Sequence, residues 1–185
     1  MSSKTITFIR HGQATHNPFF DNGTYDPSRD EELFDAPLTD LGRRQAEAIN
    51  LGPMDLVVVS PLTRTLQTAS LIFKDHTGPI LVHQDVRETF FNSIACNRRR
   101  PLSELKDQFL CMTFGSEAGD DIGDRMIVEN MKSFQERLKR FTVWLQERPE
   151  ASIVVSHGNF LEWLIHSITG NKFHLVNCGT YTITL

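Results

Sequence analysis

The sequence contains few cysteines, no excess of positive charge and no long hydrophobic run, and each shortage excludes a class of protein. Its three cysteines, Cys96, Cys111 and Cys178, lie far apart without C-x-x-C spacing, so neither a disulfide framework nor a zinc ribbon is expected. The formal net charge of -4 argues against a general nucleic-acid binder. No apolar run reaches the length of a membrane span, and the N-terminus has no signal-peptide core. We expect a soluble cytoplasmic protein that binds neither nucleic acid nor membrane.

The remaining composition is typical of one globular domain. Of 185 residues, 39% are hydrophobic and 23% are charged, a balance found in ordinary soluble proteins. A chain of this length can bury most of its apolar surface in a single core. We therefore expect one domain over residues 1–185. The composition does not predict the oligomeric state.

Short β-branched runs alternate with helical patterns along the chain. The predicted strands are residues 5–9, 56–60, 79–82, 153–156 and 180–185, the last of them an edge strand. The predicted helices are residues 39–50 with Thr39 as N-cap, a helix beginning at Pro61, residues 102–109, and a stripe from Ile127 to Leu145. This alternation predicts an α/β fold with a doubly wound, mainly parallel sheet flanked by helices. Residues 89–125 are too long for a bare connection, so we expect a substrate-side insertion there.

Three of the predicted strands end in reactive polar residues. Arg10 and His11 follow the first strand. Arg64 lies about one helical turn beyond Ser60, and His157 follows the strand at 153–156. Because parallel strands present their carboxyl ends at one edge of a sheet, we expect these groups to converge. Two arginines and two histidines beside helix N-termini would attract an anion.

Four segments of the sequence resemble the signature segments of the histidine phosphatase superfamily, also called phosphoglycerate mutase-like proteins. They are FIRHGQATHN, LTDLGRRQAEA, VVVSPLTRTLQTA and IVVSHGNFL, in the order of that family and over essentially the whole chain. Further similarity to a eukaryotic phosphoglycerate mutase-like subgroup comes from FDAPLT, CNRRRPLSELKDQF and FTVWLQERPEASIVVSHGNFL. The resemblance implies a small phosphorylated substrate, inorganic phosphate as product, and no metal or cofactor.

The resemblance also implies a role for each residue at the strand ends. His11 would be the covalent nucleophile and form a phosphohistidine. Arg10 and Arg64 would bind the phosphoryl oxygens and offset their charge. His157, if protonated, would donate a further hydrogen bond to the same oxygens.

Other candidates rest on weaker signals. Asn17 matches a family position that contacts the phosphoryl group, although a turn asparagine before a proline explains it equally well. Gly12 and Gly158 would let the backbone approach the phosphate. Glu88, in DVRETF, matches the general acid position of the family, with Asp85 as the alternative.

The run Arg98–Arg100 lies in the expected insertion and has two interpretations. It is either a solvated charge run or, through Arg98 and Arg99, a site for a second anionic group of the substrate. We expect a metal-independent phosphomonoester hydrolase. The alternatives are a phosphoglycerate mutase that uses the same pocket and a non-catalytic module that binds a phosphorylated ligand. The short insertion and the residues after Glu88, which differ from those of glycolytic mutases, favour water as the phosphoryl acceptor.

Overall fold

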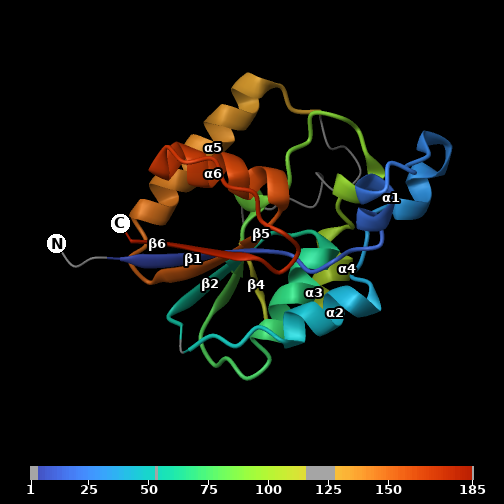
Figure 1. Cartoon of the computed structure of the whole chain (residues 1–185). Coiled ribbons are helices and arrows are strands. Elements are labelled where there is room, and N and C mark those ends of the chain that lie inside the picture. Colours follow the sequence, from blue (N-terminus) through green and yellow to red (C-terminus); the bar gives the residue numbers. More distant parts are fainter. Residues whose placement is uncertain (1–3, 53, 116–127, 185) are drawn as a thin grey trace.

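The structure, a computed structural model, describes residues 4–52, 54–115 and 128–184 (Figure 1). Within these ranges six strands form one sheet in the order β4-β3-β2-β5-β1-β6. The strands are β1 (Thr5–Arg10), β2 (Leu56–Val59), β3 (Ile80–Val82), β4 (Thr113–Phe114), β5 (Ala151–Ser156) and β6 (Thr180–Thr184). The α-helices are α1 (Asn17–Asp21), α2 (Asp40–Glu47), α3 (Thr63–Ile72), α4 (Leu102–Gln108), α5 (Met131–Gln146) and α6 (Gly158–Thr169). Short 3₁₀ helices are η1 (Pro27–Leu33), η2 (Gln84–Val86) and η3 (Ala95–Asn97).

The sheet is parallel except at one edge, which confirms the predicted fold class. β5 pairs in parallel with both β1 and β2, and β3 lies in parallel between β2 and β4. β6 runs antiparallel to β1 at the edge of the sheet, as its alternating sequence predicts. The sequence does not predict the edge strand β4, because two residues are too few to show a pattern.

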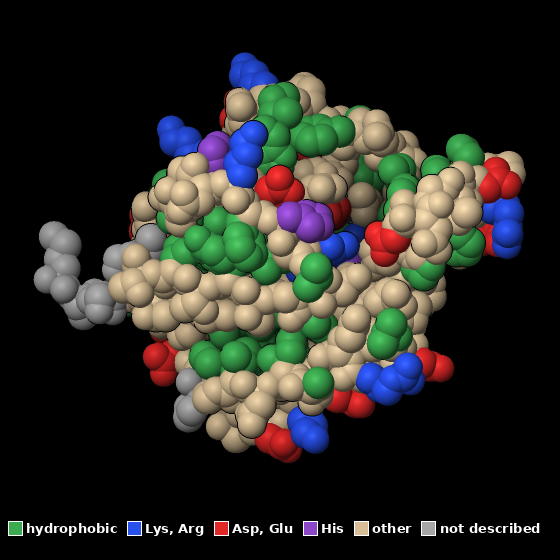
Figure 2. Space-filling view, viewed as in Figure 1, with side chains coloured by type: hydrophobic (Ala, Val, Ile, Leu, Met, Phe, Trp, Pro, Cys, Tyr) green, Lys and Arg blue, Asp and Glu red, His purple; other side chains and the backbone are tan. Residues whose placement is uncertain are grey.

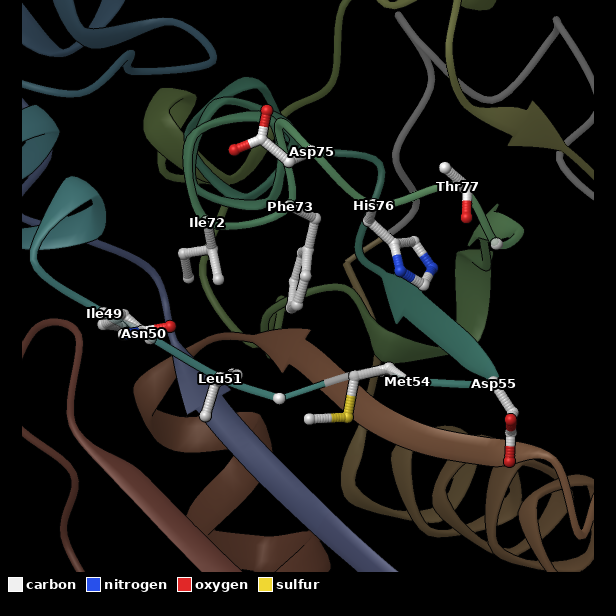
Figure 3. A pocket seen from close by; sticks show the side chains of 12 residues that line it. Ile49, Asn50, Leu51, Met54, Asp55, Ile72, Phe73, Asp75, His76 and Thr77 are labelled. Atoms are coloured by element: carbon white, nitrogen blue, oxygen red, sulfur yellow. The ribbon is translucent and has the colours of Figure 1, made fainter.

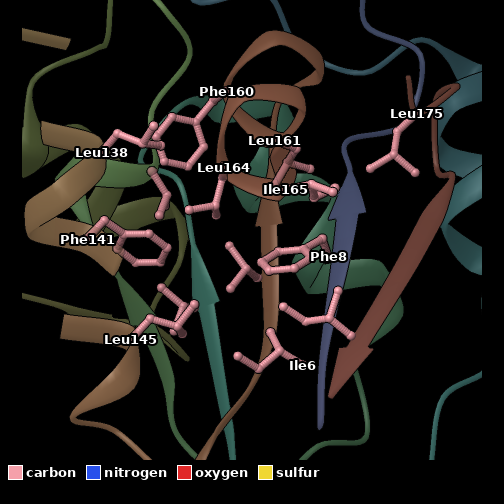
Figure 4. Close-up of a cluster of buried hydrophobic side chains, with 14 of the residues drawn as sticks. Ile6, Phe8, Leu138, Phe141, Leu145, Phe160, Leu161, Leu164, Ile165 and Leu175 are labelled. Atoms are coloured by element: carbon pink, nitrogen blue, oxygen red, sulfur yellow. The ribbon is translucent and has the colours of Figure 1, made fainter. Parts of the chain in front are cut away.

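Helices cover both faces of the sheet and enclose two hydrophobic cores. α5 and α6 lie on one face, and α2, α3 and α4 lie on the other (Figure 1). Neighbouring strand residues point to opposite faces, so Phe8 packs under α5 and α6 while Ile9 joins the second core. Figure 4 shows the first core, to which Phe141 of α5 and Phe160 of α6 contribute from the helices and Phe8 from the sheet.

Side-chain caps decide where several helices begin. Thr39 caps α2 as predicted, and its hydroxyl accepts a hydrogen bond from the Gly42 N–H at 3.0 Å. α2 ends at Glu47, three residues before the predicted end. Asn130 caps α5 through a capping box with Ser133. Ile127, where the predicted stripe begins, lies outside the described residues.

The helix predicted to begin at Pro61 begins instead at Thr63. Leu62 has an extended conformation, with φ −80° and ψ 141°, and is the N-cap. The carboxylate of Asp35 accepts hydrogen bonds from the Thr63 N–H at 2.9 Å and the Thr63 hydroxyl at 2.7 Å. A cap supplied from a distant loop therefore sets the first turn of α3, which no local pattern reveals.

The stretch 89–125, predicted as an insertion on the substrate side, is divided in the structure. Leu102 and Leu105 of α4 are buried in the second core, and β4 extends the sheet. Residues 94, 96 and 97 border a cavity at the carboxyl ends of the strands. Residues 116–125 lie outside the described part. Among the described helices, none combines the length and hydrophobicity that crossing a bilayer requires.

Candidate active site

A cavity of about 220 Å³ opens at the carboxyl ends of β1 and β5. Figure 2 shows histidine, arginine and acidic side chains gathered around a hollow on this face. The structure brings together here six residues that the sequence singled out: Arg10, His11, Asn17, Arg64, Glu88 and Gly158. The convergence follows from the parallel sheet, since β1 and β5 are neighbours with Arg10 beside Ser156.

His11 is held with one ring nitrogen bonded to the backbone and the other directed at an arginine. Its Nδ1 lies 2.7 Å from the carbonyl oxygen of Gly12, which accepts a hydrogen bond only if Nδ1 carries the proton. Nε2 accepts a hydrogen bond from Nε of Arg64 at 3.2 Å. Burial, and then the charge of Arg64, lowers the pKa of His11 well below its ordinary value. His11 is therefore a neutral imidazole whose unprotonated Nε2 faces Arg64 and the cavity.

Arg64, in the first turn of α3, is almost fully buried and is held by the segment around η3. Its Nη1 donates to the Cys96 carbonyl at 2.5 Å, and its Nη2 donates to the Asn97 side-chain oxygen at 2.8 Å. With Nε on His11, each nitrogen of the guanidinium has a fixed direction. This arrangement positions a permanent positive charge beside the imidazole.

Arg10 is oriented by the loop before β6, and the absence of a side chain at Gly158 leaves room for it. Its Nη1 donates to the carbonyl of Leu175 at 2.7 Å. A Cβ at Gly158 would lie 3.3 Å from Nε of Arg10, so glycine at this position leaves room for the guanidinium. The buried Nε of Arg10 has no hydrogen-bond partner among the described residues. Arg10, which lines the cavity, therefore keeps one donor unused among the described residues.

The structure shows a packing reason for glycine at position 12, and the predicted approach of this backbone to phosphate stays a prediction. A Cβ on Gly12 would lie 2.5 Å from the carbonyl oxygen of Gly42, the third residue of α2. The glycine thus permits α2 to pack against the turn after β1. The close approach is between two backbones, where the sequence suggested an approach to phosphate.

His157 lies behind the cavity and is neutral. Its ring centroid is 5.2 Å from that of His11, and its Nε2 lies 2.7 Å from the hydroxyl oxygen of Ser60. Burial, followed by the charge of Arg64, lowers the pKa of His157 well below its ordinary value. The protonated form that the sequence analysis considered is therefore not favoured. Its buried Nδ1 has no hydrogen-bond partner among the described residues.

The structure separates the two candidates for the general acid. Glu88 lines the cavity beside the N-terminus of α6. Its carboxylate accepts hydrogen bonds from the N–H groups of Thr89 at 2.8 Å, Phe160 at 2.9 Å and Asn159 at 3.3 Å. Asp85 is absent from the cavity lining and instead forms an ion pair with Arg140 at 3.0 Å. Only Glu88 is placed to reach a bound molecule.

Asn17 combines the two interpretations that its sequence context allows. It lines the cavity as the first residue of α1. Its side-chain oxygen accepts a hydrogen bond from the Ala14 N–H at 2.8 Å, which closes the turn, and lies 3.4 Å from the Asn177 amide nitrogen. The turn orients the asparagine, and its position in the lining leaves its amide group beside the cavity.

The arginine run does not enter the cavity. Arg98 donates to the carboxylate of Glu31 at 2.5 Å, and Arg100 lies 3.9 Å from the carboxylate of Asp35. Arg99 is buried and donates to the carbonyl of Arg100 at 3.2 Å. Glu31 of η1 and the buried Asp35 thus pair with the half-buried Arg98 and Arg100. The structure does not bring Arg98 or Arg99 together with His11.

Several lining residues were missed or given little weight by sequence reasoning. They come from α1, the η3 region, the start of α6 and the loop before β6: His16, Phe20, Asp21, Ile94, Cys96, Asn97, Asn159 and His174. The sequence favours a local structural role for His16, and its ring lies 6.0 Å from that of His11. Of the remainder, Asn159 lies within IVVSHGNFL, and Cys96 and Asn97 begin CNRRRPLSELKDQF, so the resemblance could have pointed to these three. Phe20, Asp21, Ile94 and His174 lie outside the segments that carry the resemblance.

The donor set suits an anion and offers no preformed metal site. Among the described residues, no group of three or more histidine, cysteine, aspartate or glutamate side chains is placed to hold a metal ion. The cavity instead holds the guanidinium groups of Arg10 and Arg64, whereas the N–H groups of Asn159 and Phe160 at the start of α6 are bonded to the Glu88 carboxylate. This set can stabilise the negative charge of a phosphoryl group.

A larger cavity of about 610 Å³ lies at the other end of the parallel strands, before β2 and β3 (Figure 3). Its lining includes Asp55, Asp75 and His76 but neither lysine nor arginine. The space therefore lacks the positive charge that an anion requires. Chemistry, not volume, identifies the smaller cavity as the candidate site.

The doubly wound α/β fold thus carries a neutral histidine and two arginines at the strand ends, a set suited to an anion. The chain belongs to the histidine phosphatase superfamily (branch 1), whose profile matches residues 6–184. A phosphoglycerate mutase-like protein of Arabidopsis thaliana is 29% identical over an aligned length of 225 residues. The alignment covers 95% of this chain and 82% of the relative.

Two solved structures show the same fold at lower identity. The alpha-ribazole phosphatase of Shigella flexneri matches with a TM-score of 0.65 and 24% identity, over 97% of this chain and 89% of that chain. The phosphoglycerate mutase of Thermus thermophilus matches with a TM-score of 0.57 and 20% identity, over 97% and 92% respectively. The fold is thus shared by a phosphatase and a mutase, and the choice between the two activities depends on the site.

Proposed function

We propose that this chain is a metal-independent phosphomonoester hydrolase that acts through a phosphohistidine at His11. The observation that carries the proposal is the fixed tautomer of this buried histidine. Nδ1 is bonded to the carbonyl of Gly12, and Nε2 is directed toward Arg64 and the cavity. A neutral imidazole with a free Nε2 lone pair is the form that attacks phosphorus.

In the first half-reaction Nε2 of His11 forms a bond to phosphorus while the bond from phosphorus to the ester oxygen breaks. Arg10 and Arg64 stabilise the charge on the phosphoryl oxygens. The carboxyl group of Glu88 gives its proton to the departing alkoxide, which leaves as an alcohol. The Gly12 carbonyl continues to accept the hydrogen bond from Nδ1–H. This bond stabilises the positive charge of the phosphorylated imidazole.

In the second half-reaction water replaces the alcohol. The Glu88 carboxylate accepts a proton from water as its oxygen attacks phosphorus, and the bond from phosphorus to Nε2 breaks. Inorganic phosphate is released and His11 returns to its neutral form. We propose that the Ser60 hydroxyl, 2.7 Å from Nε2 of His157, donates to that nitrogen, which leaves the proton of the ring on Nδ1 as a further donor.

The ion pairs of the arginine run favour water, and not a second phosphorylated metabolite, as the acceptor of the phosphoryl group. A mutase must bind a substrate with additional anionic groups, and Arg98 and Arg100 are engaged by Glu31 and Asp35. We propose a small phosphorylated substrate as the physiological partner. The three free cysteines are consistent with a reducing compartment such as the cytoplasm.

The test is to trap the covalent intermediate. Radiolabelled substrate and wild-type protein, quenched within the first turnovers in base, should yield protein-bound phosphate that is lost on acidification, as expected for a phosphoramidate. His11→Asn should retain none, and hydrolysis by the wild type should persist in EDTA. Turnover of phosphate esters by His11→Asn at the wild-type rate would contradict the proposal.

A further inference from the structure

The segment 85–90, which carries Glu88, is held on its backbone by one buried arginine. Arg137, on α5, is 2% exposed. Its Nη1 donates to the carbonyls of Asp85 at 2.8 Å and Arg87 at 2.9 Å, and its Nη2 donates to the carbonyl of Glu88 at 3.3 Å. A single guanidinium therefore bonds three of the four consecutive carbonyls from residue 85 to residue 88.

A buried glutamate completes this arrangement. The carboxylate of Glu129 accepts from Nε of Arg137 at 3.1 Å and from Nη2 at 2.5 Å, a bidentate pair. The same carboxylate accepts from the N–H of Phe90 at 2.9 Å, and the Glu129 N–H donates to the Phe90 carbonyl at 2.9 Å. We call Arg137 and Glu129 together the Arg137–Glu129 clamp.

The remaining carbonyl of the segment is bonded from the opposite side. The hydroxyl of Ser156, the residue before His157, donates to the carbonyl of Val86 at 2.6 Å. The Glu88 carboxylate in turn accepts from the backbone of Asn159 and Phe160. The segment is thus fixed between α5 and the start of α6, and the position of its carboxylate depends on both attachments.

We propose that Arg137 and Glu129 are positioning residues for proton transfer by Glu88. This inference rests on the proposed function, in which Glu88 protonates the leaving oxygen. An uncompensated ion pair inside a protein is costly, and here almost every donor and acceptor of the pair is used on one segment. Neither side chain lines the cavity, so the clamp acts through Glu88 without contacting the substrate. A displacement of about 1 Å at a reacting group can cost roughly a hundredfold in rate.

The clamp is tested by comparing two neighbouring arginines of α5. Arg137→Lys keeps the positive charge but has one nitrogen in place of a planar group that reaches three carbonyls. The matched control is Arg140→Lys, since Arg140 pairs with the exposed side of Asp85 and does not contact the backbone of the segment. Activity is measured on an alkyl phosphate, whose alkoxide needs a proton, and on p-nitrophenyl phosphate, whose leaving anion does not.

Arg137→Lys should lower kcat for the alkyl phosphate about tenfold to a hundredfold and kcat for p-nitrophenyl phosphate less than about threefold. Arg140→Lys should leave both values unchanged. Glu129→Gln, which keeps the shape of the carboxylate, should show the same substrate-dependent loss and decides the matter if Arg137→Lys does not fold.

Three other results would contradict either the clamp or the proposed function. Equal losses on both substrates in folded variants would overturn the clamp as an aid to proton transfer and make it a purely structural pair. Unchanged kinetics would overturn it directly. A wild type that hydrolyses neither ester would instead refute the proposed function, so the two failures are distinguishable.

Discussion

Two neighbouring segments of this protein share one pattern, a strand followed by histidine and glycine, and differ in how the histidine is bonded. β1 ends before His11 and Gly12, and β5 ends before His157 and Gly158. Both histidines are buried, and burial lowers the pKa of each well below its ordinary value. The local sequence alone does not say which of them is reactive.

The bonding partners separate the two histidines. His11 uses Nδ1 on its own backbone neighbour and presents Nε2 to the cavity. His157 uses Nε2 on Ser60, a residue from the end of a third strand. The two rings therefore differ in where Nε2 points: that of His11 faces Arg64 and the cavity, whereas that of His157 faces the Ser60 hydroxyl, and of the two histidines only His11 lines the cavity.

The largest effect on turnover should come from replacing each of the two histidines separately by asparagine. His11→Asn should reduce turnover to background, on the order of a millionfold, as removal of a covalent nucleophile does. His157→Asn should cost about a hundredfold to a thousandfold, the effect of losing one donor to a developing charge, and should still form the phosphoenzyme. Steady-state rates and rapid-quench labelling measure both. Covalent phosphate on His11→Asn, or none on His157→Asn, would reverse the two assignments.

A smaller effect on turnover should distinguish the residue that serves the leaving group, Glu88, from the nucleophile, His11. Glu88 bonds to the α6 side, so its loss should affect the leaving group and spare the nucleophile. Glu88→Gln should slow hydrolysis of an alkyl phosphate about a hundredfold to ten-thousandfold and hydrolysis of p-nitrophenyl phosphate much less. Asp85→Asn is the control, since its carboxylate faces Arg140 and should leave both rates unchanged. An alkyl-specific loss in Asp85→Asn would move the role to that residue.

The smallest effect concerns stability and pH. In the folded protein the pKa values of His11 and His157 lie below 6.5, the ordinary value that applies to the unfolded chain. Below about pH 6.5 the unfolded chain therefore binds more protons, and the free energy of unfolding falls as pH is lowered. Above that value these histidines are neutral in both states and contribute no pH dependence. Each should contribute a slope of at most about 1.4 kcal/mol per pH unit.

Urea unfolding of the protein without ligand, at several values between about pH 5.5 and 7.5, measures this slope. His157→Gln should give a shallower slope than the wild type, because one of the groups that take up protons on unfolding is removed. Stability that increases as pH falls through this range, or identical slopes in the two proteins, would contradict the pKa directions.

Much of the fold and the membership of the site could be predicted from local sequence. Continuous β-branched runs mark β2 and β5 because a strand buried on both faces requires apolar residues at successive positions, whereas alternation marks β1. Placement of Arg10, His11 and His157 at one edge follows from a general property of parallel sheets, whereas Glu88 was singled out by the family resemblance. Two helix starts illustrate the limit of local rules. Thr39 caps α2 from within its own turn and was predicted, whereas Asp35 caps α3 from a distant loop and was not.

The sequence by itself determined which residue types follow each strand, because the pattern of apolar and polar residues is local. Only the tertiary structure decided what these residues do to one another. It engages Arg98 with Glu31, and it holds the backbone around Glu88 with Arg137, 49 positions further along the chain. It also assigns Ser60 to Nε2 of His157, across 97 positions. Protonation and direction depend on the nearest charge and donor in space, and folding brings those partners from sequence positions that no local pattern connects.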